Sequence, residues 1–214
     1  MLREIPLFSR LDDKALGDLE KAAIKRAYPK NTILISKGDK SDQLFVVLKG
    51  KLKVAVTDAS GKEIIMSLLG AGDYFGEMAM IDGESRSATI VTTQASDVLT
   101  ISRDDFHRTL LSSPELMFEL LKVLARKVRI ATDKLESLAF EDVYGRLVKL
   151  LIQLAKPRDD RWMVEESLTH QEIANMIGSS REMVTRILKA LTSGGYISVD
   201  KKRITIKRKF PASF

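Results

Sequence analysis

Hydrophobic and polar positions change their pattern twice along the chain. Between about 31 and 101, short apolar runs alternate with glycine-containing turns, which is typical of an antiparallel barrel or jelly roll. The preceding stretch, 12–27, has the spacing of a short amphipathic helix. We therefore expect a β-rich domain over 1–112. Its clearest predicted strands are Thr32–Ile35, Leu44–Leu48, Lys51–Val56 and Glu63–Leu68.

A second pattern begins at Pro114 and continues, without another proline or any glycine, to about Phe140. Apolar residues recur there at alternating spacings of four and three, which is the heptad repeat of a coiled coil. We expect a long helix over 113–141 that joins two chains into a homodimer; a helix packed on its own domain is the alternative. The repeat consists of Met117, Leu121, Leu124, Val128, Ala131, Leu135 and Leu138.

The last third of the chain changes to short helices and short strands. Thr169 and Glu172 have the spacing of a capping box, which marks the start of a helix. Gly178 can supply the left-handed residue that turns the chain steeply into a second helix, capped by Ser179 or Ser180. These features predict a helix-turn-helix, and an ordinary pair of packed helices is the alternative.

The second of these helices has an apolar face and a charged face. On the charged face, arginine forks can bind guanine, and a glutamate can accept a hydrogen bond from cytosine. Two alternating strands, 196–199 and 203–206, follow as a wing with a basic tip. We expect a winged helix-turn-helix domain over 142–214 that binds double-stranded DNA. The predicted DNA-binding residues are Thr169, Ser180, Arg181, Glu182, Thr185, Arg186, Lys189, Lys201 and Lys202.

The net charge of +6 lies wholly in this last domain. Residues 142–214 contain 14 Lys and Arg against 8 Asp and Glu, whereas residues 1–141 contain 21 of each kind. A basic excess confined to one domain favours a polyanionic partner, which agrees with DNA binding.

A segment between two predicted strands, 75–88, has chemistry suited to a cyclic phosphate. Arg86 can pair with the phosphate oxygens, and Ser87 with neighbouring backbone amides can complete the site. Glu77 can accept a hydrogen bond from a ribose hydroxyl, which a deoxy sugar could not donate. By itself the pattern also fits a turn with a surface salt bridge.

The chain resembles the CRP/FNR family of transcription regulators over nearly its whole length. The resemblance rests on the segment 75–88, on residues 138–146 and on the helix-turn-helix 169–188. It implies a homodimer in which a ligand in each barrel contacts the long helices and reorients the DNA-binding domains. It also implies RNA polymerase as a partner, and pseudo-palindromic DNA with TGTGA-like half-sites. The residues that match the family's base-reading pattern are Arg181, Glu182 and Arg186.

The resemblance further implies a cyclic nucleotide as the effector. Family members that bind cAMP usually place a Thr-Ser pair of the long helix against the adenine, but the aligned pair here is Ala131-Thr132. The segment from Gly76 to Arg86 is also one residue shorter than in bacterial members of that kind. We expect cAMP; cyclic di-GMP, or action without a ligand, are the alternatives. The ligand-binding residues implied are Gly76, Glu77, Arg86, Ser87, Ala131 and Thr132.

Composition excludes several classes of protein. The chain contains no cysteine, which rules out iron–sulfur sensing, and its two distant histidines, His107 and His170, disfavour a metal or haem site. No apolar run approaches the roughly 20 residues that cross a bilayer, and no signal-peptide core begins the sequence, so we expect a cytoplasmic protein without a membrane partner. No catalytic constellation or P-loop is present, so we expect neither an enzyme nor a cofactor besides the effector.

Overall fold

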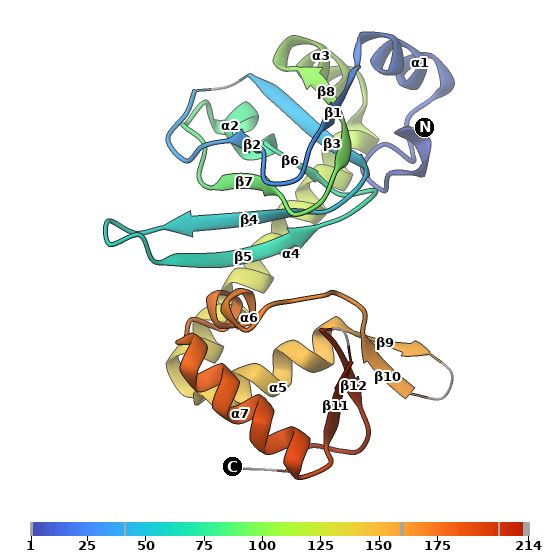
Figure 1. Cartoon of the computed structure of the whole chain (residues 1–214). Coiled ribbons are helices and arrows are strands. Elements are labelled where there is room, and N and C mark those ends of the chain that lie inside the picture. The colour runs from blue at the N-terminus through green and yellow to red at the C-terminus, as the bar shows by residue number, and fades with distance from the viewer. Residues whose placement is uncertain (1, 41, 159–160, 201, 212–214) are drawn as a thin grey trace. The chain divides into compact units, whose positions relative to one another are not determined.

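The computed structural model describes residues 2–40, 42–158, 161–200 and 202–211. The chain divides into two compact units, Met1–Arg129 and Ile130–Phe214, and each is described by itself (Figure 1). The long helix α4 (Pro114–Phe140) contributes residues to both units and has the extent that the heptad pattern predicted. Among the described residues, no helix is both long and apolar enough to span a membrane.

The first unit is built on two antiparallel four-stranded sheets, which confirms the predicted jelly roll. The sheets have the strand orders β1-β8-β3-β6 and β2-β7-β4-β5. Side chains from both sheets, including Phe45, Leu52 and Ile90, form a shared core between them. The strands are β1 (Ile24–Tyr28), β2 (Ile33–Ile35), β3 (Gln43–Lys49), β4 (Leu52–Thr57), β5 (Glu63–Leu69), β6 (Tyr74–Phe75), β7 (Thr89–Thr92) and β8 (Ser96–Ser102).

Helices bury a second core of this unit against strands β3 and β8. Phe8, Phe106 and Leu116 are among its fully buried side chains. The amphipathic helix expected over 12–27 is shorter than predicted, because the chain leaves it at Ala23 and pairs as β1 with β8. The helical elements are η1 (Leu2–Glu4), α1 (Asp13–Ala22), the short α2 (Glu77–Asp82) and α3 (Arg103–Ser112).

The second unit has the predicted winged helix-turn-helix architecture. Its antiparallel sheet has the order β11-β12-β10-β9. The edge strand β9 was not predicted; it tolerates Pro157 because an edge position does not need every backbone N–H. The elements are α5 (Val143–Leu154), β9 (Ala155–Arg158), β10 (Arg161–Val164), α6 (His170–Ile177), α7 (Arg181–Ser193), β11 (Ile197–Asp200) and β12 (Arg203–Ile206).

Arg146 fixes the position of α6 relative to the start of α5. Its Nε donates to the carbonyl of Ile177 at the end of α6, over 2.9 Å, and its Nη1 donates to the carbonyl of Glu141, over 2.7 Å. Carbonyls at the end of a helix have no intrahelical donor, so the guanidinium satisfies one of them while it joins the two helices. Asp142 caps α5 by accepting from Gly145 N. The motif at 142–146 therefore orients the helix-turn-helix.

Candidate ligand pocket and DNA-reading face

The predicted ligand-binding segment lies in the first unit, between β6 and β7, and contains the short helix α2 (Figure 1). Gly76 precedes α2 with φ +92°, a conformation that favours glycine. A Cβ atom at Gly76 would lie 2.6 Å from Arg86 Nη1 and 2.9 Å from the carbonyl oxygen of Gln43. Glycine is therefore required here both by the backbone conformation and by the close approach of the arginine.

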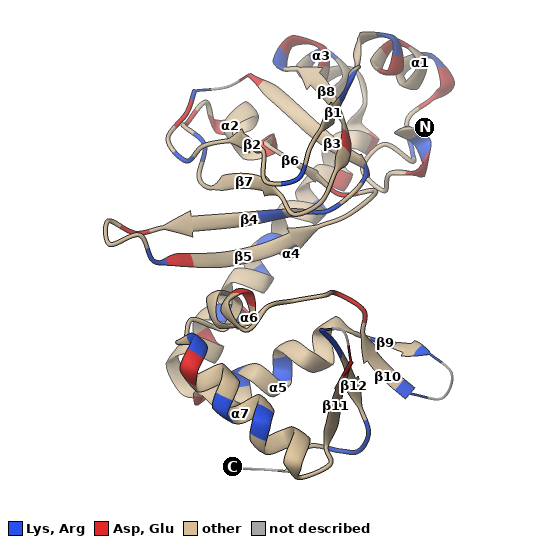
Figure 2. Cartoon of the chain, viewed as in Figure 1, with Lys and Arg blue, Asp and Glu red and all other residues tan. Residues whose placement is uncertain are grey.

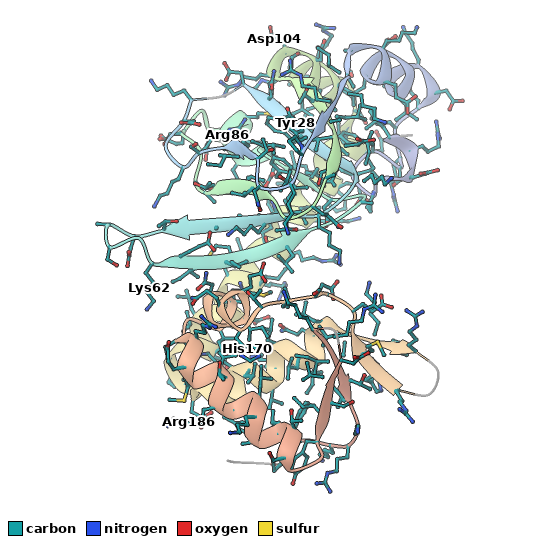
Figure 3. The ribbon with its side chains drawn as sticks, in the orientation of Figure 1. Tyr28, Lys62, Arg86, Asp104, His170 and Arg186 are labelled. Carbon is teal, nitrogen blue, oxygen red and sulfur yellow. The ribbon has the colours of Figure 1, made fainter. Side chains whose placement is uncertain are left out.

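Arg86 is the buried cation of this segment, with only 3% of its surface exposed (Figure 3). Its Nη1 donates to the Gly76 carbonyl and its Nη2 to the Gln43 carbonyl, each over 2.7 Å. Its guanidinium carbon lies 5.9 Å from the centre of the Phe45 ring. Burial lowers the pKa of Arg86, although the charges of Asp42 and other nearby carboxylates oppose this shift. The result is a fixed positive fork, the geometry that suits an anionic phosphate.

Glu77, predicted to accept from a ribose hydroxyl, is 1% exposed and forms an ion pair with Lys127 of α4. Lys127 also lies 5.9 Å from the centre of the Tyr74 ring. Burial, followed by the charge of Glu77, raises the pKa of Tyr74. Lys127 was not among the predicted site residues. The available signal was its position four residues before Ala131, which places both residues on one face of the helix.

The remaining predicted ligand residues are exposed. Ser87 follows Arg86 directly and is exposed to solvent. Ala131 and Thr132 are exposed positions of α4 that belong to the second unit, whereas Gly76, Glu77 and Arg86 are brought together in the first. The roles of Ser87, Ala131 and Thr132 toward a ligand therefore stay predictions.

The helix-turn-helix forms from the local signals that predicted it. The Thr169 hydroxyl accepts from Glu172 N, and the Glu172 carboxylate accepts from Thr169 N, so that the capping box is complete. Gly178 ends α6 with φ +64°. The Ser180 hydroxyl accepts from Met183 N and thereby caps α7.

Helix α7 buries its apolar face in the core of the second unit and turns its charged face to solvent. Figure 2 shows several Lys and Arg positions, in blue, along the ribbon of α7. Arg186 lies on this helix in Figure 3, and its Nη2 contacts Met183 Sδ over 2.8 Å. The buried residues are Val184, Ile187, Leu188 and Leu191. The exposed residues are those predicted to face DNA, namely Arg181, Glu182, Thr185, Arg186 and Lys189.

A groove of about 490 Å³ lies between α6, α7 and the wing, and its lining includes Thr169, His170, Arg181 and Lys202. Lys202 occupies the turn between β11 and β12 with φ +65°. Lys201, also predicted to bind DNA, lies outside the described residues. The structure thus gathers predicted DNA-binding groups from three elements on one surface of this unit, while their contacts with DNA stay predictions.

Among the described residues, no group of three or more His, Cys, Asp or Glu side chains lies close enough together to hold a metal ion.

Models of known protein families match a segment in each of the two units. The family model named cyclic nucleotide-binding domain matches residues 25–113, and the Crp-like helix-turn-helix domain matches residues 145–209. The cAMP-activated global transcriptional regulator CRP of Salmonella typhimurium is 36% identical over 183 residues, which cover 84% of this chain and 87% of the relative.

Solved structures show the same fold. The Thermus thermophilus catabolite activator protein is 30% identical, with a TM-score of 0.57, over 94% of this chain and 93% of that one. The c-di-GMP responsive global regulator CLP of Xanthomonas campestris is 24% identical, with a TM-score of 0.79, over 92% of this chain and 100% of that one. The relatives are regulators of transcription rather than enzymes. The chain belongs to the CRP/FNR family of DNA-binding transcription regulators and carries a cyclic nucleotide-binding domain followed by a Crp-like helix-turn-helix.

Proposed function

We propose that the protein is a homodimeric transcription regulator controlled by cAMP, which binds in the N-terminal domain. The observation that carries this proposal is the buried Arg86 fork, held beside Gly76 and close to the carboxylate of Glu77. Hydrogen bonds to the Gly76 and Gln43 carbonyls hold the guanidinium in place, and its positive fork suits the phosphate of a cyclic nucleotide. The ribose of the nucleotide carries a hydroxyl that can donate a hydrogen bond to Glu77. The cAMP-activated relative from Salmonella supports adenine as the base.

A regulator that answers to cyclic di-GMP is the second candidate. It is favoured by Ala131, which lacks a hydroxyl for hydrogen bonding to adenine. The fold shared with a regulator described as c-di-GMP responsive is compatible with it. A third alternative is a regulator that acts without any ligand.

Calorimetry on protein stripped of carried-over nucleotide separates these candidates. We expect one cAMP to bind per chain, with weaker binding of cGMP because its base presents different hydrogen-bonding groups. Tighter binding of cyclic di-GMP than of cAMP would support the second candidate. An absence of heat with all three nucleotides would overturn control by a cyclic nucleotide while leaving DNA binding intact.

The homodimer is proposed from the apolar stripe that α4 leaves exposed in the single chain. Val128 is 65% exposed, Leu135 69% and Leu138 51%. Large exposed apolar side chains in a heptad repeat are typical of a helix that packs against a second copy. Leu124, another position of the repeat, packs instead against the core of the first unit. Replacing Leu124 would therefore also disturb the core of the single chain, so it is a poor site for a test of dimerisation.

Replacing Val128 and Leu135 with glutamate should convert the dimer to monomers at micromolar concentration, because like charges would face each other in the seam. Specific DNA affinity should fall when the dimer is lost, since a monomer contacts only one half-site. Light scattering measures the mass, and Ile130→Glu is the matched control because Ile130 lies on the same helix off the seam, 50% exposed. A monomer mass for the unaltered protein would contradict the proposal.

We propose pseudo-palindromic DNA as the target, with TGTGA-like half-sites about one helical turn, roughly 34 Å, apart. Arg181, Glu182 and Arg186, all exposed on α7, are the proposed base-reading residues. Lys202, and Lys201 beside it, are proposed to contact phosphates from the wing. RNA polymerase is a proposed protein partner, in line with the relatives' role in transcription.

A further inference from the structure

A hydrogen bond joins the two helices of the helix-turn-helix on the proposed DNA-reading side. Nδ1 of His170, the first residue of α6, lies 2.7 Å from the hydroxyl of Thr185 on α7. Figure 3 labels His170 in the second unit, where it lines the groove between α6, α7 and the wing. Thr185 is itself exposed among the predicted DNA-binding residues. The bond therefore couples a titratable side chain to the position of a residue on the reading helix.

The second hydrogen bond of the Thr185 hydroxyl shows which atom donates in the contact between His170 and Thr185. The threonine hydroxyl donates its single proton to the carbonyl of Arg181, over 2.8 Å. It must therefore accept from His170, so that Nδ1 of the imidazole carries a proton. This bond persists in both charge states of the ring. Titration consequently changes Nε2, which is an acceptor in the neutral ring and a charged donor in the protonated one.

The described charged residues that line the groove beside His170 are cations. Arg181 of α7 and Lys202 of the wing line the same groove, and no carboxylate is among the described residues that line it. Glu172, on the same helix as His170, accepts hydrogen bonds from both the backbone N and the hydroxyl of Thr169. The other charged residues of α7 and the wing, Glu182, Arg186, Lys189, Asp200 and Arg203, are outside the lining set.

DNA changes the local charge around His170, because each phosphate brings a negative charge into the cationic groove. A neighbouring anion favours the protonated imidazole, so the complex binds protons more tightly than the free protein does. By linkage, a complex that holds more protons than its components becomes tighter as pH falls. Histidine is the side chain that changes its charge between about pH 5 and 8.

We propose that His170 is a proton-linked DNA contact. On binding it takes up a proton at Nε2 and donates to a backbone phosphate, while Nδ1 holds Thr185 in place on α7. Specific DNA affinity is therefore higher in mildly acidic solution than in neutral solution. The inference rests on the proposed DNA-reading face. It adds a phosphate contact by His170 and a dependence of DNA affinity on pH.

The test is the affinity for a duplex recovered by binding-site selection, measured at pH 7.5 and pH 6.0 with fixed cAMP and salt. For the unaltered dimer, with two such histidines, we expect about tenfold tighter binding at pH 6.0. His170→Gln should abolish this dependence, since its amide can still donate to Thr185 but cannot titrate. His170→Arg, with a fixed charge, should bind tightly at both pH values.

The chain offers a matched control, because its only other histidine is His107. His107 lies in the first unit, where Nε2 is 2.7 Å from the carbonyl oxygen of Met80. His107→Gln should keep the pH dependence of the unaltered protein. Calorimetry in buffers of different ionisation enthalpy should count up to two protons taken up per unaltered dimer, a number that a purely structural role for His170 would not produce.

Two outcomes are kept apart by this design. An equal pH dependence in His170→Gln and the unaltered protein, or no proton uptake on binding, would overturn the inference while specific binding remained. Failure of the unaltered protein to prefer any duplex, at either pH, would instead contradict the proposed DNA-reading function.

Discussion

Replacing Arg86 with alanine is expected to lower nucleotide affinity by at least about 100-fold. Hydrogen bonds between charged partners contribute about 1.5–3 kcal/mol each, and a guanidinium fork supplies two of them to a phosphate. The loss of both corresponds to about 3–6 kcal/mol, and each 1.4 kcal/mol is tenfold in affinity. Calorimetric titration with cAMP measures the change. Arg86→Lys should restore only part of the affinity, because an ammonium keeps the charge but loses the fork.

The control for this variant is Arg103→Ala. Arg103 also donates to carbonyls of α2, with Nη2 3.1 Å from the Met80 oxygen, but it lies outside the predicted ligand-binding residues. Removing Arg103 should lower stability while leaving nucleotide affinity within about twofold, since a lost hydrogen bond to a carbonyl costs about 1–3 kcal/mol of stability. Unchanged cAMP affinity in a folded Arg86→Ala protein would remove Arg86 from the ligand site.

Replacing Arg181 or Arg186 with alanine should reduce specific DNA binding more than any other change on α7. A bidentate arginine–guanine pair contributes about 1–3 kcal/mol of discrimination, and a dimer loses it in both half-sites. Each variant should also relax the preference at one guanine position per half-site. Binding-site selection followed by affinity measurement on specific and random duplexes gives both effects.

Lys202→Ala provides the contrast, because the wing is proposed to contact phosphate rather than bases. It should weaken binding to all sequences alike and make the affinity less dependent on salt. If Arg181→Ala instead lowered the affinity for specific and random DNA equally, α7 would not be the reading helix.

Elements with a local signal were predictable from the sequence. Helix α4 was predicted because a heptad repeat, with no further proline and no glycine, follows Pro114 as far as Phe140. Helix α6 was predicted because the capping box at Thr169 and the left-handed Gly178 define both of its ends. These signals depend only on residues that are close in sequence, so they can be recognised before the fold is known.

Elements defined by distant partners were missed. Strand β1 is almost wholly exposed and shows no alternation of apolar residues; its pairing with β8 joins residues as far apart as Ile24 and Thr100. The edge strand β9 contains Pro157, which argued against a strand. Likewise, the ion pair of Glu77 with Lys127 spans 50 residues. Such contacts are created by tertiary packing and leave little trace in a local pattern.

Control of DNA binding by a nucleotide in the N-terminal domain is tested most directly by measuring DNA affinity with and without cAMP on protein stripped of nucleotide. A ligand can shift the DNA-competent arrangement only by its differential affinity for the two states, and couplings of this kind are typically about 5–150-fold. We expect saturating cAMP to tighten binding to the selected duplex by about tenfold or more, and Arg86→Ala to abolish the gain. Equal affinity with and without cAMP, cGMP and cyclic di-GMP would contradict the account.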